Sequence, residues 1–170
     1  MKCTKVSAFL LISLTLLFSA CKKNSGDDLE YFLKFKLNGN WVTHKAAVGE
    51  LGPDLADDSY TNLGITGNSD NGNEVFDIAI QVAGSNFATG TYNSDDHAVI
   101  IAYAINSPAL KFYTLGSVVG HPDSKYTITI TSITDDTIKG TFTGNYLEDG
   151  LEDDATVEVT EGEFVVPRIR

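Results

Sequence analysis

Hydrophobic and polar residues alternate one by one over most of the chain after residue 30. The segment 31–37 places Leu33 and Phe35 on one side and Lys34 and Lys36 on the other. Successive side chains of a β-strand point to opposite faces, so a period of two predicts a strand with one buried face. The same period recurs in the segments 75–82, 126–131, 138–146 and 157–166. These five segments predict the main strands of the domain.

Two local features refine this pattern. Asn38-Gly39-Asn40 has the composition of a tight hairpin turn, so we expect the chain to return through Trp41 with its ring packed in the core. In the last segment the apolar phase shifts from Val157 and Val159 to Phe164 and Val166. Gly162 lies at the shift, which predicts a β-bulge there.

Weaker strand patterns fall at 61–67, 90–93, 98–105 and 110–114, and no helical period is evident after residue 21. About ten short strands separated by Gly, Asn and Asp turns favour an all-β fold. We expect an antiparallel β-sandwich, with a β-barrel as the alternative. No repeat or internal boundary divides residues 30–170, so we expect them to form a single domain.

The first 21 residues follow a different pattern. Lys2 and Lys5 precede an apolar run over 6–17, which is shorter than the ~20 residues that a membrane-spanning helix needs. This arrangement is typical of a secretory signal. Residues 18–21, Phe-Ser-Ala-Cys, resemble the bacterial lipobox, with Phe in place of the usual Leu.

The lipobox resemblance implies that residues 1–20 are a lipoprotein signal peptide and that Cys21 becomes the lipidated first residue of the mature chain. The alternative is an ordinary secretory signal cut near Ala20. The polar segment 21–29 would then be a flexible tether between lipid and domain. Attachment through Cys21 implies a location on the bacterial outer membrane, with the periplasmic or cell-surface face left open.

Removal of residues 1–20 also decides the cysteine chemistry and the charge. Cys3 leaves with the signal and Cys21 carries lipid, so the mature domain has no thiol for a disulfide, a zinc site or a nucleophile. The signal holds two of the 12 basic residues and none of the 23 acidic ones, so the net charge changes from −11 to 10 − 23 = −13. Such a surface repels nucleic acid and anionic lipid and favours a soluble monomer.

Four short motifs resemble a known family. They are FKLNGNW at 35–41, GTY at 90–92, GTFTG at 140–144 and TEGEF at 160–164. Together they are similar to small β-sandwich lipoprotein domains of unknown function that are common in Bacteroidetes, over residues 31–166. The resemblance implies an all-β lipoprotein and supplies no catalytic residue.

The sequence offers little catalytic chemistry. It has no G-x-S-x-G or S-x-x-K motif and no H-E-x-x-H pair. His44, His97 and His121 stand in unlike contexts, and we expect incidental surface or loop histidines. We therefore expect no enzyme, no catalytic residue and no resident cofactor, although convergence of the three histidines in space stays open.

Acidic residues cluster in the expected loops, which leaves calcium open as a cofactor. The clusters are 54/57/58, 70/71/74, 95/96 and 148–154, and none has the EF-hand spacing. We expect solvated loops at these places. If each strand crosses the fold, the loops 68–74, 94–97 and 147–155 share the end at which the turn 38–40 lies. The strand count therefore predicts an acidic rim opposite the tether.

These observations predict a lipid-anchored, non-enzymatic binding or accessory module with an unknown ligand. A glycan ligand requires at least two exposed, coplanar aromatic rings. A role as scaffold or inhibitor for an envelope protein requires an exposed sheet edge or an ordered loop. A hydrolase, the least favoured class, requires a pocket in which histidine and carboxylate groups converge.

Overall fold

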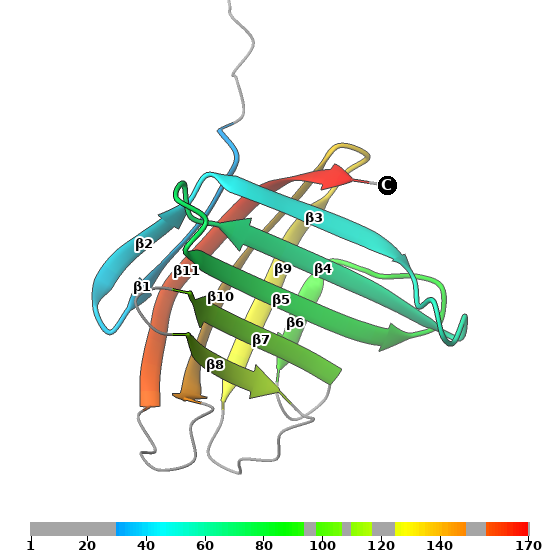
Figure 1. Ribbon diagram of the computed structural model, residues 1–170. Helices are drawn as coiled ribbons and strands as arrows, with labels where there is room; N and C mark the ends of the chain where they lie inside the picture. Colours follow the sequence, from blue (N-terminus) through cyan, green and yellow to red (C-terminus); the bar gives the residue numbers. More distant parts are fainter. Residues whose placement is uncertain (1–29, 94–97, 107–109, 117–124, 149–155, 170) are drawn as a thin grey trace, which may run out of the picture.

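The computed structural model of the protein describes residues 30–93, 98–106, 110–116, 125–148 and 156–169 (Figure 1). These residues form eleven β-strands and no helix, which confirms the predicted all-β class. The strands are β1 (Phe32–Leu37), β2 (Asn40–His44), β3 (Ala46–Pro53), β4 (Tyr60–Asn68), β5 (Glu74–Ala83), β6 (Gly90–Asn93), β7 (Ala98–Ile105), β8 (Lys111–Gly116), β9 (Tyr126–Ile133), β10 (Thr137–Glu148) and β11 (Thr156–Ile169).

Hydrogen bonding joins the strands into one curled sheet, a half-barrel, where the sequence predicted two separate sheets. The order across the sheet is β2-β1-β11-β3-β4-β5-β7-β8-β10-β9-β6, with an additional pairing of β10 with β11. The pairing of β3 with β11 is parallel and covers only two residue pairs, as does the antiparallel pairing of β8 with β10. These two short junctions connect two groups of strands and let the sheet fold over its own core.

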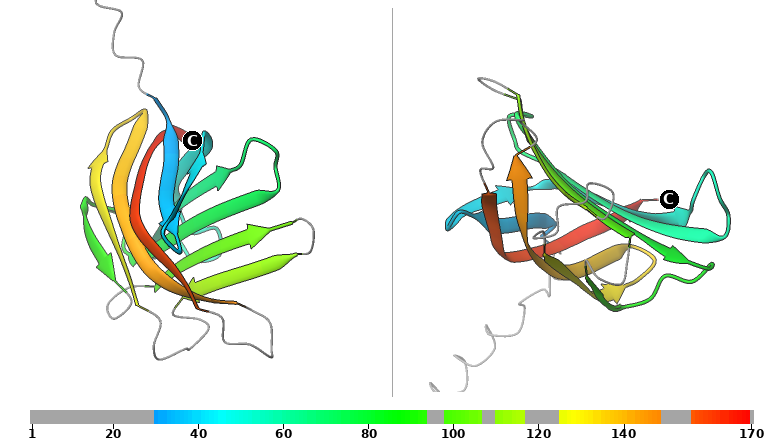
Figure 2. Two further views of the ribbon diagram at one scale, coloured as in Figure 1. Left: turned by 90° about the vertical axis from the view of Figure 1, so that its left-hand side faces the viewer. Right: turned by 90° about the horizontal axis from the view of Figure 1, so that it is seen from below.

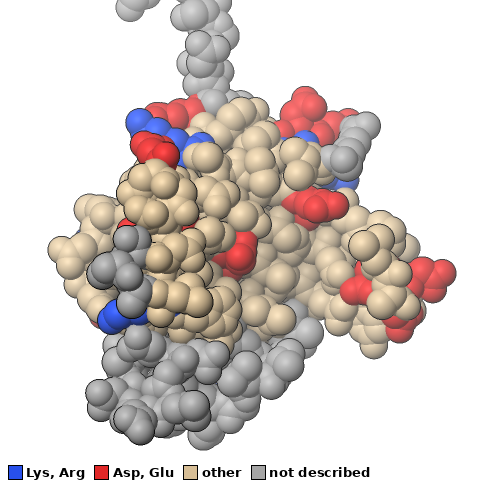
Figure 3. Space-filling view, viewed as in Figure 1, with Lys and Arg blue, Asp and Glu red and all other residues tan. Residues whose placement is uncertain are grey.

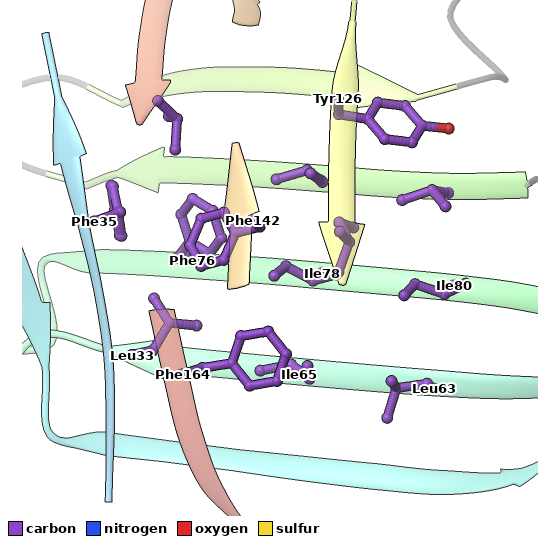
Figure 4. Packing of buried hydrophobic residues seen from close by; sticks show 14 of the residues in the cluster. Leu33, Phe35, Leu63, Ile65, Phe76, Ile78, Ile80, Tyr126, Phe142 and Phe164 are labelled. Carbon is purple, nitrogen blue, oxygen red and sulfur yellow. The ribbon is translucent and has the colours of Figure 1, made fainter. Parts of the chain in front are cut away.

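The two groups cross each other. In Figure 1 the strands β3, β4, β5, β7 and β8 run across the view, whereas β1, β11, β10 and β9 run steeply behind them. The left view of Figure 2 looks onto the second group. Side chains from both groups meet between them, as Figure 4 shows for Phe35, Phe76, Phe142 and Phe164. The ring centroids of Phe35 and Phe76 lie 4.5 Å apart, and those of Phe76 and Phe142 5.1 Å apart.

The predicted core faces of the main strands are confirmed. The buried side chains include Leu33, Phe35, Phe76, Ile78, Ile80, Tyr126, Ile128, Ile130, Ile138, Phe142, Val157, Val159, Phe164 and Val166. The predicted bulge in β11 is also present, since Gly144 pairs with Val159 whereas Phe142 pairs with Gly162. The residue with positive φ is Glu161 (φ 51°), next to the expected glycine.

The strand β3 is absent from the sequence-based prediction because its alternation is weak. Two of its eight residues are glycines. A Cβ on Gly49 would stand 2.9 Å from both Ile138 Cδ1 and Val166 Cγ2, so the sheet needs a glycine where β10 and β11 pack over β3. The pattern of apolar side chains in β3 is interrupted where β10 and β11 leave little room for a side chain.

The extra strand overturns the predicted placement of the loop 68–74. Ala46 of β3 pairs with Asn68, and a Cβ on Gly67 would lie 3.1 Å from His44 Nδ1. His44 itself pairs with Leu33 near the start of β1. This loop therefore lies at the end where the chain enters the domain, away from the turn at Asn38-Gly39. The other two loops of the predicted rim, 94–97 and 147–155, fall outside the described residues, except for residues 147 and 148 at the end of β10.

The chain enters the described domain at β1 and leaves it on the same side, because Phe32 pairs with Val165. No helix that could span a membrane occurs among the described residues. The signal peptide 1–20, lipidated Cys21 and the tether 21–29 lie outside the described residues, so those predictions stay open.

Candidate functional site

The predicted burial of Trp41 is wrong: its side chain is 55% exposed. Asn38 (φ 49°) and Gly39 (φ 80°) form a two-residue turn, and this turn aligns Leu37 with Asn40 and Lys36 with Trp41. Directly paired residues of antiparallel strands share a face. Trp41 therefore lies on the outer face with Lys36, and the turn length was the signal that could have placed it there.

Four charged residues accompany Trp41 on this face. Lys36 Nζ lies 5.1 Å from the centroid of the Trp41 ring and 2.7 Å from Glu161 Oε1. Lys34 Nζ lies 3.0 Å from Glu163 Oε2. We call these five residues (Lys34, Lys36, Trp41, Glu161 and Glu163) the outer platform. Two cations and two anions leave it without net charge, in a protein whose formal net charge is −11.

The bulge in β11 brings Glu161 to the platform. Residue 161 is the extra residue of β11 between the pairs Lys36–Thr160 and Lys34–Glu163. A bulge re-aims side chains relative to the regular strand, and φ above zero is unusual for a residue other than glycine. Its carboxylate consequently reaches Lys36, and Glu163 is left to pair with Lys34.

A shallow hollow of about 370 Å³ continues the platform across β10 and β9. Its lining includes Thr127, Thr129, Thr141, Thr143, Glu161 and Glu163. One row of paired residues crosses it in the order Thr129, Thr141, Glu163, Lys34 and Thr43. Four strand spacings make this row roughly 19 Å long. Hydroxyl, carboxylate and ammonium groups thus lie beside an exposed indole on one face.

His44 also differs from the prediction, because it is fully buried instead of being a surface or loop residue. It faces inward from β2 opposite Leu33, and its ring packs edge-on against Phe35. Neither ring nitrogen has a hydrogen-bond partner among the described residues. The nearest carboxylate oxygen there is Glu74 Oε2, 3.5 Å from His44 Nε2.

Glu74 also forms a hydrogen bond with Tyr103 of β7, whose side chain is buried. Desolvation, followed by the hydrogen bond and the negative charge of Glu74, raises the pKa of the Tyr103 hydroxyl above its ordinary value. His44, Glu74 and Tyr103 hence connect β2, β5 and β7. They contain no hydroxyl of the Ser or Thr type and do not line the hollow, so this cluster has the character of a polar packing contact. His97 and His121 lie outside the described residues.

In the acidic turn between β3 and β4, the carboxylates accept hydrogen bonds from the turn itself and from neighbouring strands. Asp54 Oδ1 accepts hydrogen bonds from the backbone N–H groups of Ala56 and Asp57. Asp54 Oδ2 accepts from Asn62 Nδ2 and Gln81 Nε2, at 2.7 and 3.0 Å. These bonds, the one from Asn62 first, hold the pKa of Asp54 below its ordinary value.

Asp57 behaves in the same way. Its Oδ1 accepts from the backbone N–H and the hydroxyl of Ser59, and these bonds lower the pKa of Asp57. The turn therefore resembles a self-capped Asx turn. Figure 3 shows acidic side chains gathered where this turn projects, at the right of the view.

The remaining acidic clusters give no metal site in the part of the chain that the structure describes, where no three His, Cys, Asp or Glu side chains gather for a metal ion. Glu74, of the predicted cluster 70/71/74, contacts His44 and Tyr103. Asp95, Asp96 and the residues 149–154 lie outside the described ranges, so calcium stays untested there.

Comparisons with known proteins find no matching family model, no matching curated protein and no matching solved structure. The similarity to small Bacteroidetes lipoprotein domains therefore stays a prediction from the four sequence motifs. The geometry of the outer platform carries the functional argument.

Proposed function

We propose that the protein is a lipid-anchored, non-enzymatic binding module of the bacterial outer membrane. Cleavage after residue 20 would leave Cys21 as the lipidated first residue, and 21–29 would tether the domain. The basic, apolar and Phe-Ser-Ala-Cys segments in succession support this anchor. Several acyl chains on one cysteine hold a protein far more firmly than one chain does. The domain itself would be monomeric and would bind no nucleic acid, as its acidic balance favours.

We propose further that the outer platform captures a neutral glycan. The observation that carries this proposal is the exposed indole of Trp41 within a set of charges that sums to zero. A pyranose ring stacks on an aromatic face while its hydroxyl groups bond to neighbouring donors and acceptors. A neutral platform neither repels nor selects a charged ligand, so it suits an uncharged one.

A second aromatic ring lies on the same face. Phe32 shares the outer side of β1 with Lys34, whose Nζ lies 4.8 Å from the centroid of the Phe32 ring. Phe32 and Lys36, the partner of Trp41, are four residues apart in the strand, which corresponds to roughly 13 Å. Phe32 is half-buried, so it adds apolar surface near Trp41 but is not a second exposed, coplanar ring, and the glycan proposal rests on Trp41.

Replacing Trp41 by alanine is expected to weaken glycan binding at least tenfold, about 1.4 kcal/mol, because the stacking surface is lost. A glycan array with the wild-type protein identifies the ligand, and calorimetry then compares the variants. Tyr60→Ala is the matched control, since Tyr60 is an exposed aromatic residue on β4, away from the platform. Equal affinities of the wild type and W41A would refute the platform as the glycan site.

Replacing Cys21 by alanine is expected to move the protein from the membrane fraction to the soluble periplasmic or culture fraction, because the acyl chains can no longer be attached. Fractionation with immunodetection measures this, and mass spectrometry of the mature N-terminal peptide detects the lipid. Cys3→Ala is the control, because Cys3 would be removed with the signal. Membrane retention of C21A equal to that of the wild type would contradict the anchor.

A second candidate function is capture of an envelope protein at a sheet edge. The observation in its favour is that β2 pairs with β1 alone among the described strands, so one side of β2 presents backbone groups that a partner strand can bind. Cross-linking in the native envelope separates the two candidates. One stoichiometric protein partner favours edge capture, whereas recovery of glycan alone favours the platform.

A further inference from the structure

The inner face of β11 ends in an arginine. Phe164 and Val166 are both fully buried, and two residues further along the same face comes Arg168. The backbone of Arg168 is held in the parallel junction with β3, where it pairs with Gly49. The alternation that predicts the core in this strand therefore directs a guanidinium group towards the interior at the mouth of the half-barrel.

Arg168 lines a pocket of about 450 Å³, which we call the mouth pocket. Its walls include Leu51, Pro53, Thr61, Asn86, Phe87 and Arg168. Phe87 is supported from behind by Tyr92, whose ring stacks on it at a centroid distance of 5.0 Å. Mouths of β-barrels are common ligand sites, and pockets of this volume hold small organic molecules. Leu51, Pro53 and Phe87 give the mouth pocket apolar walls, beside polar groups and the cation of Arg168.

The protein holds the guanidinium group but leaves its charge uncompensated within the described part of the chain. Arg168 Nη1 donates to the carbonyl oxygen of Thr134 at 3.1 Å, and Arg168 Nε is enclosed without a hydrogen-bond partner there. No carboxylate among the described residues lies within ion-pair distance of it. An enclosed donor without a partner is unfavourable, and more so if it is charged. Because Nε has almost no exposed surface, a ligand in the mouth pocket would meet the terminal nitrogens of the guanidinium group.

The acidic neighbours restrict the charge of a ligand. Asp58 lines the mouth pocket and is exposed. Asp54, in the same turn, already accepts four hydrogen bonds from its own surroundings. Asp58 would repel a second negative charge near the rim, so a ligand with one carboxylate fits better than a dianion.

We propose that the mouth pocket binds a small organic monocarboxylate, with its carboxylate on Arg168 and its apolar body between Leu51 and Phe87. Arginine binds carboxylates through two parallel N–H···O bonds, and a partly dehydrated site strengthens them. This site lies on the inner side of the sheet and is independent of the outer platform, so either proposal can fail without the other.

The first test compares a carboxylate with its amide on the full-length wild-type protein. The probe is 3-phenylpropionate, and 3-phenylpropionamide has the same shape without the charge. We expect saturable binding of one 3-phenylpropionate per chain by calorimetry and at least tenfold weaker binding of the amide. No saturable binding of 3-phenylpropionate, or equal binding of both compounds, would overturn the proposal without any variant.

The second test locates the site. Arg168→Gln is expected to weaken 3-phenylpropionate binding at least tenfold, whereas Lys45→Gln removes the same charge from an exposed residue between β2 and β3 and leaves binding unchanged. Phe87→Ala provides a second variant if R168Q does not fold, and it should also weaken binding. Wild-type affinity in R168Q, or in F87A where R168Q is unfolded, would refute the site.

Discussion

Replacing Phe35 by alanine is expected to lower the free energy of unfolding by about 4 kcal/mol, in the range for large aromatic residues removed from a core. Phe35 is fully buried and lies where the two groups of strands meet. Its ring contacts Phe76 at a centroid distance of 4.5 Å, Tyr103 at 5.8 Å and Phe142 at 6.0 Å. The cavity would open among side chains of β1, β5, β7 and β10, which cannot all close on it.

Urea unfolding followed by circular dichroism measures this loss, with the dependence on urea concentration compared between variants. The control is Phe112→Ala, since Phe112 is 39% exposed on β8 and its removal opens no enclosed cavity. We expect a change below about 1 kcal/mol for F112A. Similar losses in F35A and F112A would show that Phe35 is not at the centre of the core.

Replacing Gly140 by alanine is expected to lower the free energy of unfolding by about 3 kcal/mol, because a Cβ at this position would overlap its neighbours. It would stand 2.5 Å from the carbonyl oxygen of Thr129, which is backbone, and against the ring of Phe164. Gly140 also lies at the register shift between β10 and β9. Neither the sheet backbone nor the packed ring can move away without losing other contacts.

A loss of stability in G140A would indicate close packing. The reason is that exchanging glycine for alanine at an unstrained position usually stabilises a protein, by reducing the entropy of the unfolded chain. Gly64→Ala is the matched control: Gly64 is in β4, and among the described residues no atom beyond its own and its two chain neighbours' lies within 4 Å of the position that a Cβ would take there. We expect G64A to be neutral or slightly stabilising in the same urea experiment. A neutral G140A would contradict the close packing of β9, β10 and β11.

The sequence by itself determined the all-β class and the inner faces of the long strands. In β5, β9 and β11 a long alternation of apolar and polar residues indicates which face is buried, because one face contacts the core and the other contacts water. The turn residues at 38–40 and the phase shift near Gly162 also located the hairpin and the bulge. These features depend on neighbours in the chain, so local patterns are sufficient to predict them.

The tertiary structure alone showed the strand β3 and the placement of Arg168, and it corrected the faces predicted for Trp41 and His44. An apolar ring in a short edge strand can face either side, and the register set by the turn placed Trp41 outside and His44 inside. The strand β3 depends on the packing of β10 and β11 over Gly49, which local alternation does not record. Arg168 continues an inner face past the end of the core, where the walls come from β3, β4 and the segment 85–87. For β3 and Arg168 the deciding neighbours are distant in the chain, whereas the sequence pattern reports only near ones.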